Sequence, residues 1–275
     1  MLNRYTWRTG LLEVSLWGVA AIFLGIPLYL LVNVALKPAN ERGAGFAPPE
    51  RIAWENFSTA WVDGHLPQAF GTSLVLSVVT VLLVVLLSAM AAYPLARVSR
   101  RWSTATFGYF MAGIIIPGGL GMIPLYLAMR DAGLLGTIWP LLIIYVGGGM
   151  SFNILLYTIF LRALPKEYEE AARIDGASPL RTFWLVVFPL MRPVTGTILV
   201  LQLINVYNDF FTPLLYLGGS AFTTLPLALK DFSSQYFTDW GAIFAGLLMA
   251  MAPVLIFYLS LQNHIIRGFA GGLKG

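Results

Sequence analysis

Residues 164–193 read LPKEYEEAARIDGASPLRTFWLVVFPLMRP and form the one long charged passage between segments that are otherwise apolar. Pro165 suits the first turn of a helix, because its nitrogen carries no hydrogen that would be left unpaired there. The glutamates that follow suit the positive end of the helix dipole. Gly176 stands where a left-handed residue ends a helix, and Ser178 with Pro179 is typical of the start of another. The passage therefore predicts two short helices joined by a tight turn.

The spacing within this passage resembles the EAA loop of permease subunits in ATP-binding-cassette (ABC) importers. That pattern is Glu-Ala-Ala, three residues, Gly, nine residues, an aliphatic residue, one further residue, a second aliphatic residue and Pro. The chain follows it with Glu170, Ala171, Ala172, Gly176, Val186, Phe188 and Pro189, where Phe replaces the second aliphatic residue. The resemblance implies that residues 162–193 are a cytoplasmic coupling loop that contacts a separate ATPase through Glu170, Ala171, Ala172, Asp175, Gly176, Val186 and Pro189.

The first helix of this loop also has a pattern of its own. Tyr168, Ala171, Ala172 and Ile174 predict a narrow face of small and apolar residues that a neighbouring protein can approach closely, and the opposite face is charged. From the residues alone, an amphipathic loop lying on the lipid surface is the alternative to a docking helix.

The composition is that of a membrane protein. Of 275 residues, 58% are hydrophobic and only 11% are charged, which is too little polar surface for a soluble globule. The net charge of +4 comes from basic residues that border apolar segments, so it favours orientation in a membrane over nucleic-acid binding. Because the chain has no cysteine, disulfide frameworks and thiolate metal sites are excluded.

Six apolar segments are long enough to cross the hydrocarbon core, which takes about 20 helical residues. We expect these spans at residues 14–36, 72–96, 104–129, 138–161, 194–217 and 240–262. The first is read as a retained span and not as a cleaved signal peptide. Pro117 and the glycines near it predict a weakened or kinked third span that protein or a water path covers. Pro253 predicts a kink in the sixth, and residues 54–61 predict a short helix in the outer loop.

The basic residues orient these spans. Of the 17 Lys and Arg residues, all fall on one side of the membrane except Lys37, Arg42, Arg51, Arg130 and Lys230. Loops rich in Lys and Arg stay in the cytoplasm. Both termini are therefore predicted to be cytoplasmic.

The fifth predicted span carries four polar side chains. Gln202, Asn205 and Asp209 share a helical face, with Asn208 beside Asn205. A carboxylate at membrane depth must face protein or water. One interpretation is a polar lining of the solute path, because amides and carboxylates hydrogen-bond hydroxyl groups. The other is an interhelical or intersubunit hydrogen bond.

The residues needed for catalysis are missing from the sequence. It has no glycine-rich phosphate loop followed by Lys and Ser or Thr, and His65 and His264 stand alone. We therefore expect no enzyme activity, no catalytic residue, no metal site and no cofactor in this chain. ATP and Mg²⁺ are expected to bind to a partner ATPase.

Further short runs narrow the resemblance. Residues 123–127 (IPLYL), 132–135 (AGLL), 208–210 (NDF) and 267–275 (RGFAGGLKG) are similar to the shorter permease subunit of carbohydrate importers related to the maltose system. In that subunit the tail enters the ATPase dimer. The resemblance therefore implies that the tail, residues 263–275, contacts the ATPase through Gly271, Gly272, Leu273, Lys274 and Gly275. A disordered terminus is the alternative.

These observations predict an all-α protein with six spans and the type I ABC importer permease fold, in which residues 1–275 form one transmembrane domain of a bacterial cell membrane. The resemblance implies as partners a second homologous permease in a heterodimer, two cytoplasmic ATPases, an extracytoplasmic solute-binding protein and a carbohydrate. Membrane lipid surrounds the chain, and no nucleic acid is expected. An amino-acid or peptide importer of the same class and an ion-coupled secondary transporter remain alternatives. The secondary transporter fits less well, because only Asp209 is plainly ionisable within a predicted span.

Overall fold

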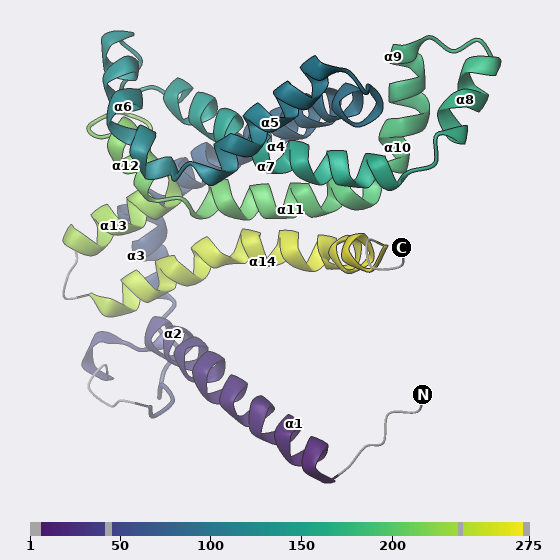
Figure 1. Ribbon diagram of the computed structural model, residues 1–275. Coiled ribbons are helices and arrows are strands. Elements are labelled where there is room, and N and C mark those ends of the chain that lie inside the picture. Colours follow the sequence, from purple (N-terminus) through teal and green to yellow (C-terminus); the bar gives the residue numbers. More distant parts are fainter. Residues whose placement is uncertain (1–6, 42–45, 236–238, 272–275) are drawn as a thin grey trace. The chain divides into compact units, whose positions relative to one another are not determined.

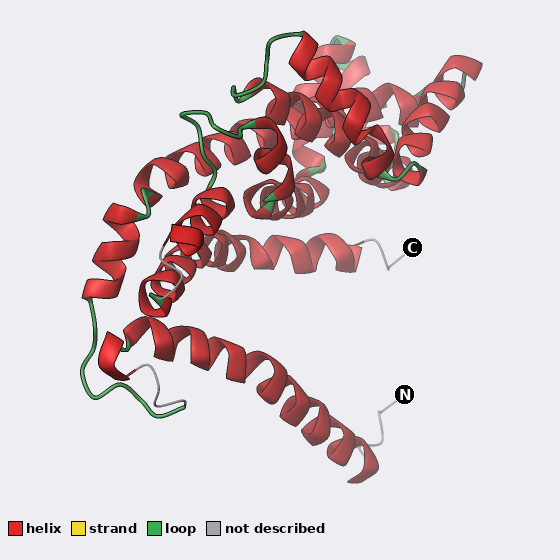
Figure 2. Ribbon diagram, turned by 90° about the vertical axis from the view of Figure 1, so that its left-hand side faces the viewer, coloured by secondary structure: helices red, strands yellow, loops and turns green. Residues whose placement is uncertain are grey.

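The protein is described by a computed structural model that covers residues 7–41, 46–235 and 239–271. Within those ranges every regular element is a helix, and Figure 2 shows helices joined by loops without a strand. The all-α expectation is confirmed. The backbone contacts divide the chain into two compact units, residues 1–67 with 228–252 and residues 68–227 with 253–275.

The first unit begins with a long apolar helix. It runs through α1 (Trp7–Ala20), a π-helical stretch (Ala21–Gly25) and α2 (Ile26–Leu36), and a 3₁₀ turn (Ala39–Glu41) follows. The helix α3 (Glu55–Asp63) lies where the sequence predicts a short helix.

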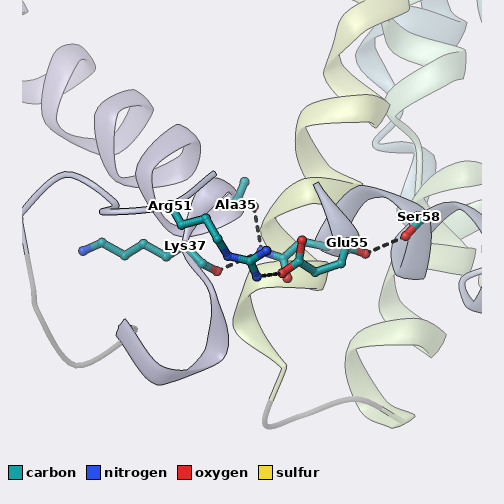
Figure 3. A network of polar contacts seen from close by, with 6 residues as sticks. Ala35, Lys37, Arg51, Glu55 and Ser58 are labelled. Atoms are coloured by element: carbon teal, nitrogen blue, oxygen red, sulfur yellow. Dashed lines mark hydrogen bonds and ion pairs between the residues drawn. The ribbon is translucent and has the colours of Figure 1, made fainter. Parts of the chain in front are cut away.

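The buried side chain of Asn56 ties α3 to the end of α2. Its amide donates hydrogen bonds to the carbonyl oxygens of Ala35, at 2.8 Å, and Lys37, at 2.9 Å. These carbonyls belong to the last turn of a helix and the residue after it, where oxygens lack partners within the helix. Arg51 pairs with Glu55 at the start of α3, and Figure 3 shows this network.

The remaining helices are labelled in Figure 1 where there is room. In chain order they are α4 (Leu66–Arg97), α5 (Arg101–Ile115), a 3₁₀ turn (Gly118–Gly121), α6 (Met122–Asp131), α7 (Trp139–Ala163), α8 (Glu167–Ile174), α9 (Pro179–Thr182), a π-helical stretch (Phe183–Val187), α10 (Phe188–Leu190), α11 (Arg192–Asn208), α12 (Phe211–Tyr216), α13 (Leu225–Gln235) and α14 (Trp240–Gly271).

Three helices among the described residues are long and apolar enough to cross a membrane: Leu12–Leu36, Leu66–Arg97 and Trp139–Ala163. Two more stretches reach that length only as bent pairs. Arg101–Ile115 and Gly118–Asp131 meet at 93°, and Pro179–Leu190 and Arg192–Asn208 meet at 74°. The stretch Trp240–Ile256 of α14 is a shorter apolar helix. The chain is therefore a multi-pass membrane protein, and the number of six spans stays a prediction.

Two predicted spans differ from the helices that form. The third was expected as one kinked helix, and it is instead broken into α5 and α6 beside Pro117. The fifth was expected to reach residue 217, but α11 ends at Asn208. It ends there because Asp209 is extended and its carboxylate accepts a hydrogen bond from the backbone N–H of Phe211, at 2.9 Å, in the first turn of α12.

The largest core of the second unit lies between α4, α7 and the helices that follow the coupling loop. Its fully buried members include Ala89, Ile154, Tyr157, Met191 and Ile198. The Tyr157 hydroxyl donates to the Thr195 hydroxyl at 3.0 Å, so the one polar group of this tyrosine is paired.

A glycine allows α7 and α11 to approach closely. A Cβ atom at Gly149 would lie 2.9 Å from Nε2 and 3.2 Å from Cδ of Gln202, whose side chain is buried. The Asn153 amide donates to the Gly149 carbonyl at 2.8 Å and lies 3.4 Å from Gln202 Oε1. Close packing and amide hydrogen bonds thus coincide at this crossing.

We expect Gly149→Ala to destabilise the protein by about 1 kcal/mol relative to the control, because the buried amide end of Gln202 must shift to admit the added methyl group. The matched control is Gly148→Ala, because a Cβ at Gly148 has no neighbour within 4 Å and the gain in helix propensity is the same. Thermal unfolding in detergent measures both variants. Equal melting temperatures for the two would contradict this account of the crossing.

Candidate functional site: the coupling loop

The two helices predicted for the charged passage are present. The helix α8 ends in a turn at Gly176, whose φ is +81°, and the N–H of Ala177 reaches back to the Ala172 carbonyl at 2.9 Å. The N–H of Gly176 bonds the Arg173 carbonyl at 3.0 Å. This pair of bonds closes a helix through a left-handed residue, which glycine adopts without steric cost. The predicted left-handed conformation of Gly176 is confirmed.

The second helical stretch of the loop, residues 179–190, is called the second limb. It starts at Pro179 with Ser178 as its N-cap, as expected. The Ser178 hydroxyl accepts from the N–H of Arg181 at 3.4 Å, and Pro179 is the first helical residue. The limb then runs without a break through the π-helical stretch to Leu190. Aromatic rings stabilise it, with Trp184 4.9 Å from Phe183 and 5.2 Å from Phe188 between ring centroids.

The helix α8 has one exposed and one buried face. Tyr168, Ala171 and Ile174 are exposed, Ile174 to 86%, together with the charged Glu170 and Asp175. Ala172, by contrast, is only 9% exposed and packs inside the chain. The expectation that Ala171 and Ala172 share one face is therefore corrected, because Ala172 is turned about 100° from Ala171 and packs within the chain, while contact with an ATPase stays a prediction for both.

The buried face of α8 carries a carboxylate whose partners sequence reasoning missed. Glu169 is 4% exposed, and its Oε1 accepts from Nε of Arg97 at 2.7 Å. Its Oε2 accepts from the hydroxyl of Tyr93 at 3.0 Å. Nη2 of Arg97 also donates to the Leu164 carbonyl, at 3.0 Å, where α7 ends. The end of α4 thus holds the coupling helix through an ion pair that is almost fully buried.

No pattern within the loop indicates Arg97 as the partner, because the two residues lie 72 positions apart. The periodicity of α8 contains the only usable signal. Glu169 and Ala172 stand at i and i+3, so they share a face, and a carboxylate on a buried face requires a donor from elsewhere.

The four polar residues predicted for the solute path differ in burial and in their hydrogen-bond partners. Gln202 is buried at the α7–α11 crossing, where its Nε2 atom has no partner among the described residues. Asp209 lies beyond the end of α11 and accepts from the Tyr145 hydroxyl at 2.9 Å as well as from the backbone of α12. For these two the geometry favours interhelical hydrogen bonds. Asn205 and Asn208 are exposed on α11, and contact with solute stays a prediction for them.

The predicted tail contacts lie at the edge of the described residues. Gly271 is the last residue of α14. Gly272, Leu273, Lys274 and Gly275 lie outside the described residues.

Comparison with known proteins assigns the family. The family of binding-protein-dependent transport system inner membrane components matches residues 85–270. That range is more than half of the chain and contains the whole coupling loop, so the chain belongs to this family of transport permease subunits.

Its relatives align over nearly their full length. The chain is 34% identical to the melibiose/raffinose/stachyose import permease protein MelC of Bacillus subtilis, covering 91% of each protein. It is 34% identical to the multiple sugar-binding transport system permease protein MsmG of Streptococcus mutans, covering 98% of this chain and 96% of MsmG.

A solved structure confirms the fold. A bacterial ABC transporter involved in the import of the acidic polysaccharide alginate contains a chain that superposes with a TM-score of 0.83, at 24% sequence identity, over 96% of this chain and 98% of the other. The type I ABC importer permease fold implied by the resemblance is therefore present.

The turn at Gly176 allows a direct test of the loop. Gly176→Val should weaken association with the ATPase, because a β-branched residue is strained at positive φ by about 1 to 2 kcal/mol or more, which corresponds to roughly a tenfold loss of affinity. Gly176→Asn is the matched control, since asparagine tolerates this conformation. Pull-down of the ATPase from membranes measures both. Normal association of Gly176→Val would refute a need for this turn.

Proposed function

We propose that this chain is the permease subunit of a sugar or oligosaccharide importer, in which it forms half of the translocation path. The observation that carries the proposal is the pair of sugar-system permeases, MelC and MsmG, that align with the chain over more than nine-tenths of its length. The probable starch degradation products permease AmyC of Thermoanaerobacterium thermosulfurigenes, 33% identical, supports the same class of solute.

The proposed complex contains a second homologous permease, two cytoplasmic ATPases and an extracytoplasmic solute-binding protein. ATP and Mg²⁺ bind to the ATPases and not to this chain. Both termini and the coupling loop are cytoplasmic, which the distribution of Lys and Arg supports. The tail after α14 contacts the ATPases in this proposal.

The exposed face of α8 supplies the proposed ATPase contact. Tyr168, Ala171 and Ile174 are exposed apolar residues of this face, Ile174 to 86%, and the charged Glu167, Glu170 and Asp175 are exposed beside them. A surface that combines apolar and charged side chains suits a protein partner. When the ATPases close on ATP, the docked helix moves, and the spans shift between inward-facing and outward-facing states.

Uptake by cells that lack this gene tests the class of solute. We expect loss of uptake of at least one of radiolabelled melibiose, raffinose and maltotriose, with glutamine and a dipeptide as controls. Restoration by the wild-type gene, and not by a gene that encodes Gly176→Val, would connect the loss to the coupling loop. Unchanged uptake of all three sugars together with lost uptake of glutamine or the dipeptide would contradict the assignment to carbohydrate.

A further inference from the structure

The end of α4 is bonded to the coupling loop through side chains, although the backbone joins the two only through α5, α6 and α7. The carboxylate of Glu169 receives one bond from Arg97, at 2.7 Å, and another from Tyr93, at 3.0 Å. The side chains of Arg97 and Glu169 are only 10% and 5% exposed. Both donors lie in the last two turns of α4.

The same turns of α4 contact the second limb of the loop. The ring of Tyr93 lies 5.3 Å from the ring of Phe183, between centroids, at an interplanar angle of 45°. Beside this contact an open apolar pocket of about 230 Å³ separates α4 from α9, lined by Met90, Tyr93, Pro94, Pro179, Leu180 and Phe183. The ion pair and the Tyr93 hydrogen bond link α4 to α8, while this packing links α4 to the second limb.

The ion pair resists opening because its charges are removed from water. Separation of Arg97 from Glu169 would leave two charges buried without partners, which is strongly unfavourable. The guanidinium of Arg97 also bonds the Leu164 carbonyl at 3.0 Å, so it joins α4, the end of α7 and α8 at one point. A displacement of α8 therefore carries the end of α4 with it.

We propose that Arg97 and Tyr93 are positioning residues that transmit the movement of the coupling helix α8 directly to the membrane span α4. Backbone continuity joins the loop to α7 and α11, and the buried carboxylate of Glu169 adds a direct link from α8 to α4 beside the core packing of α4 on those helices. This inference rests on the proposed function, because it requires that an ATPase moves α8.

Two fluorescent labels can follow the two routes separately. The chain has no cysteine, so Leu87→Cys on α4 and Leu201→Cys on α11 each place one label; these leucines are 42% and 44% exposed. The assembled transporter, with its second permease, ATPases and binding protein, is reconstituted in liposomes. The change in emission on addition of ATP with vanadate is recorded for each label.

The emission change at position 87 should fall about tenfold in Glu169→Gln. This is the factor by which loss of one charge-assisted hydrogen bond shifts the equilibrium between the two positions of α4. The response at position 201 should persist, because α11 follows the loop through the backbone. Tyr93→Phe removes one hydroxyl and should reduce the response at position 87 about threefold. Glu167→Gln is the control, because Glu167 is exposed on the same helix.

The outcomes distinguish failure of transmission through Glu169 from failure of the proposed coupling function. A full response at position 87 in Glu169→Gln, or equal losses at positions 87 and 201, would overturn transmission through this pair. If Glu169→Gln does not accumulate, Tyr93→Phe decides, and an undiminished response at position 87 overturns the proposal. If neither label responds in the wild-type complex, the proposed coupling function fails instead.

Discussion

A carboxylate withdrawn from water must find hydrogen-bond donors, and this constraint holds the coupling loop against the helices of the second unit. Glu169 meets it with Arg97 and Tyr93 from α4, and Arg97 at the same time satisfies the carbonyl of Leu164. Removing one partner of such a buried pair typically costs about 3 to 5 kcal/mol. The coupling loop is therefore built into the helices beneath it, with one face bound to the chain and the other free.

That division explains why neighbouring residues of α8 have unlike surroundings. Successive helical residues are about 100° apart, so Ala171 and Ala172 cannot both lie on the same narrow face of α8. Ala172 fills space beside the buried carboxylate, and Ala171 lies between the exposed Tyr168 and Ile174. A pattern that resembles one docking motif thus combines residues that pack within the chain with residues that stay exposed, for which contact with a partner is proposed.

Local chemistry made the loop predictable. The cap at Ser178 and the left-handed turn at Gly176 depend on residues within a few positions of each other, and both form as the sequence predicts. The partners of Glu169 depend on a helix that lies far away in the chain, so no local pattern indicates them. The same limit applies to the third predicted span, where Pro117 predicts a kink but its size depends on what packs against α5 and α6.

Helical periodicity misplaced part of the predicted solute path for a related reason. It assumes that the helix continues, whereas α11 ends before Asp209 and the carboxylate turns to cap α12. Periodicity also cannot tell which side of a helix a neighbour covers. Gln202 proves to face α7 where Gly149 permits close approach, and Asn205 and Asn208 remain on the exposed side.

In the proposed function, a separate ATPase acts on this chain at the exposed face of α8. A photoreactive amino acid at Ile174 tests it most directly, with Ile123 on α6 as a control of similar exposure, 86% against 72%. After illumination of intact complexes, mass spectrometry identifies the protein joined to each site. We expect an adduct with the ATPase from Ile174 and none from Ile123. The absence of an ATPase adduct from Ile174, or equal adducts from both positions, would contradict it.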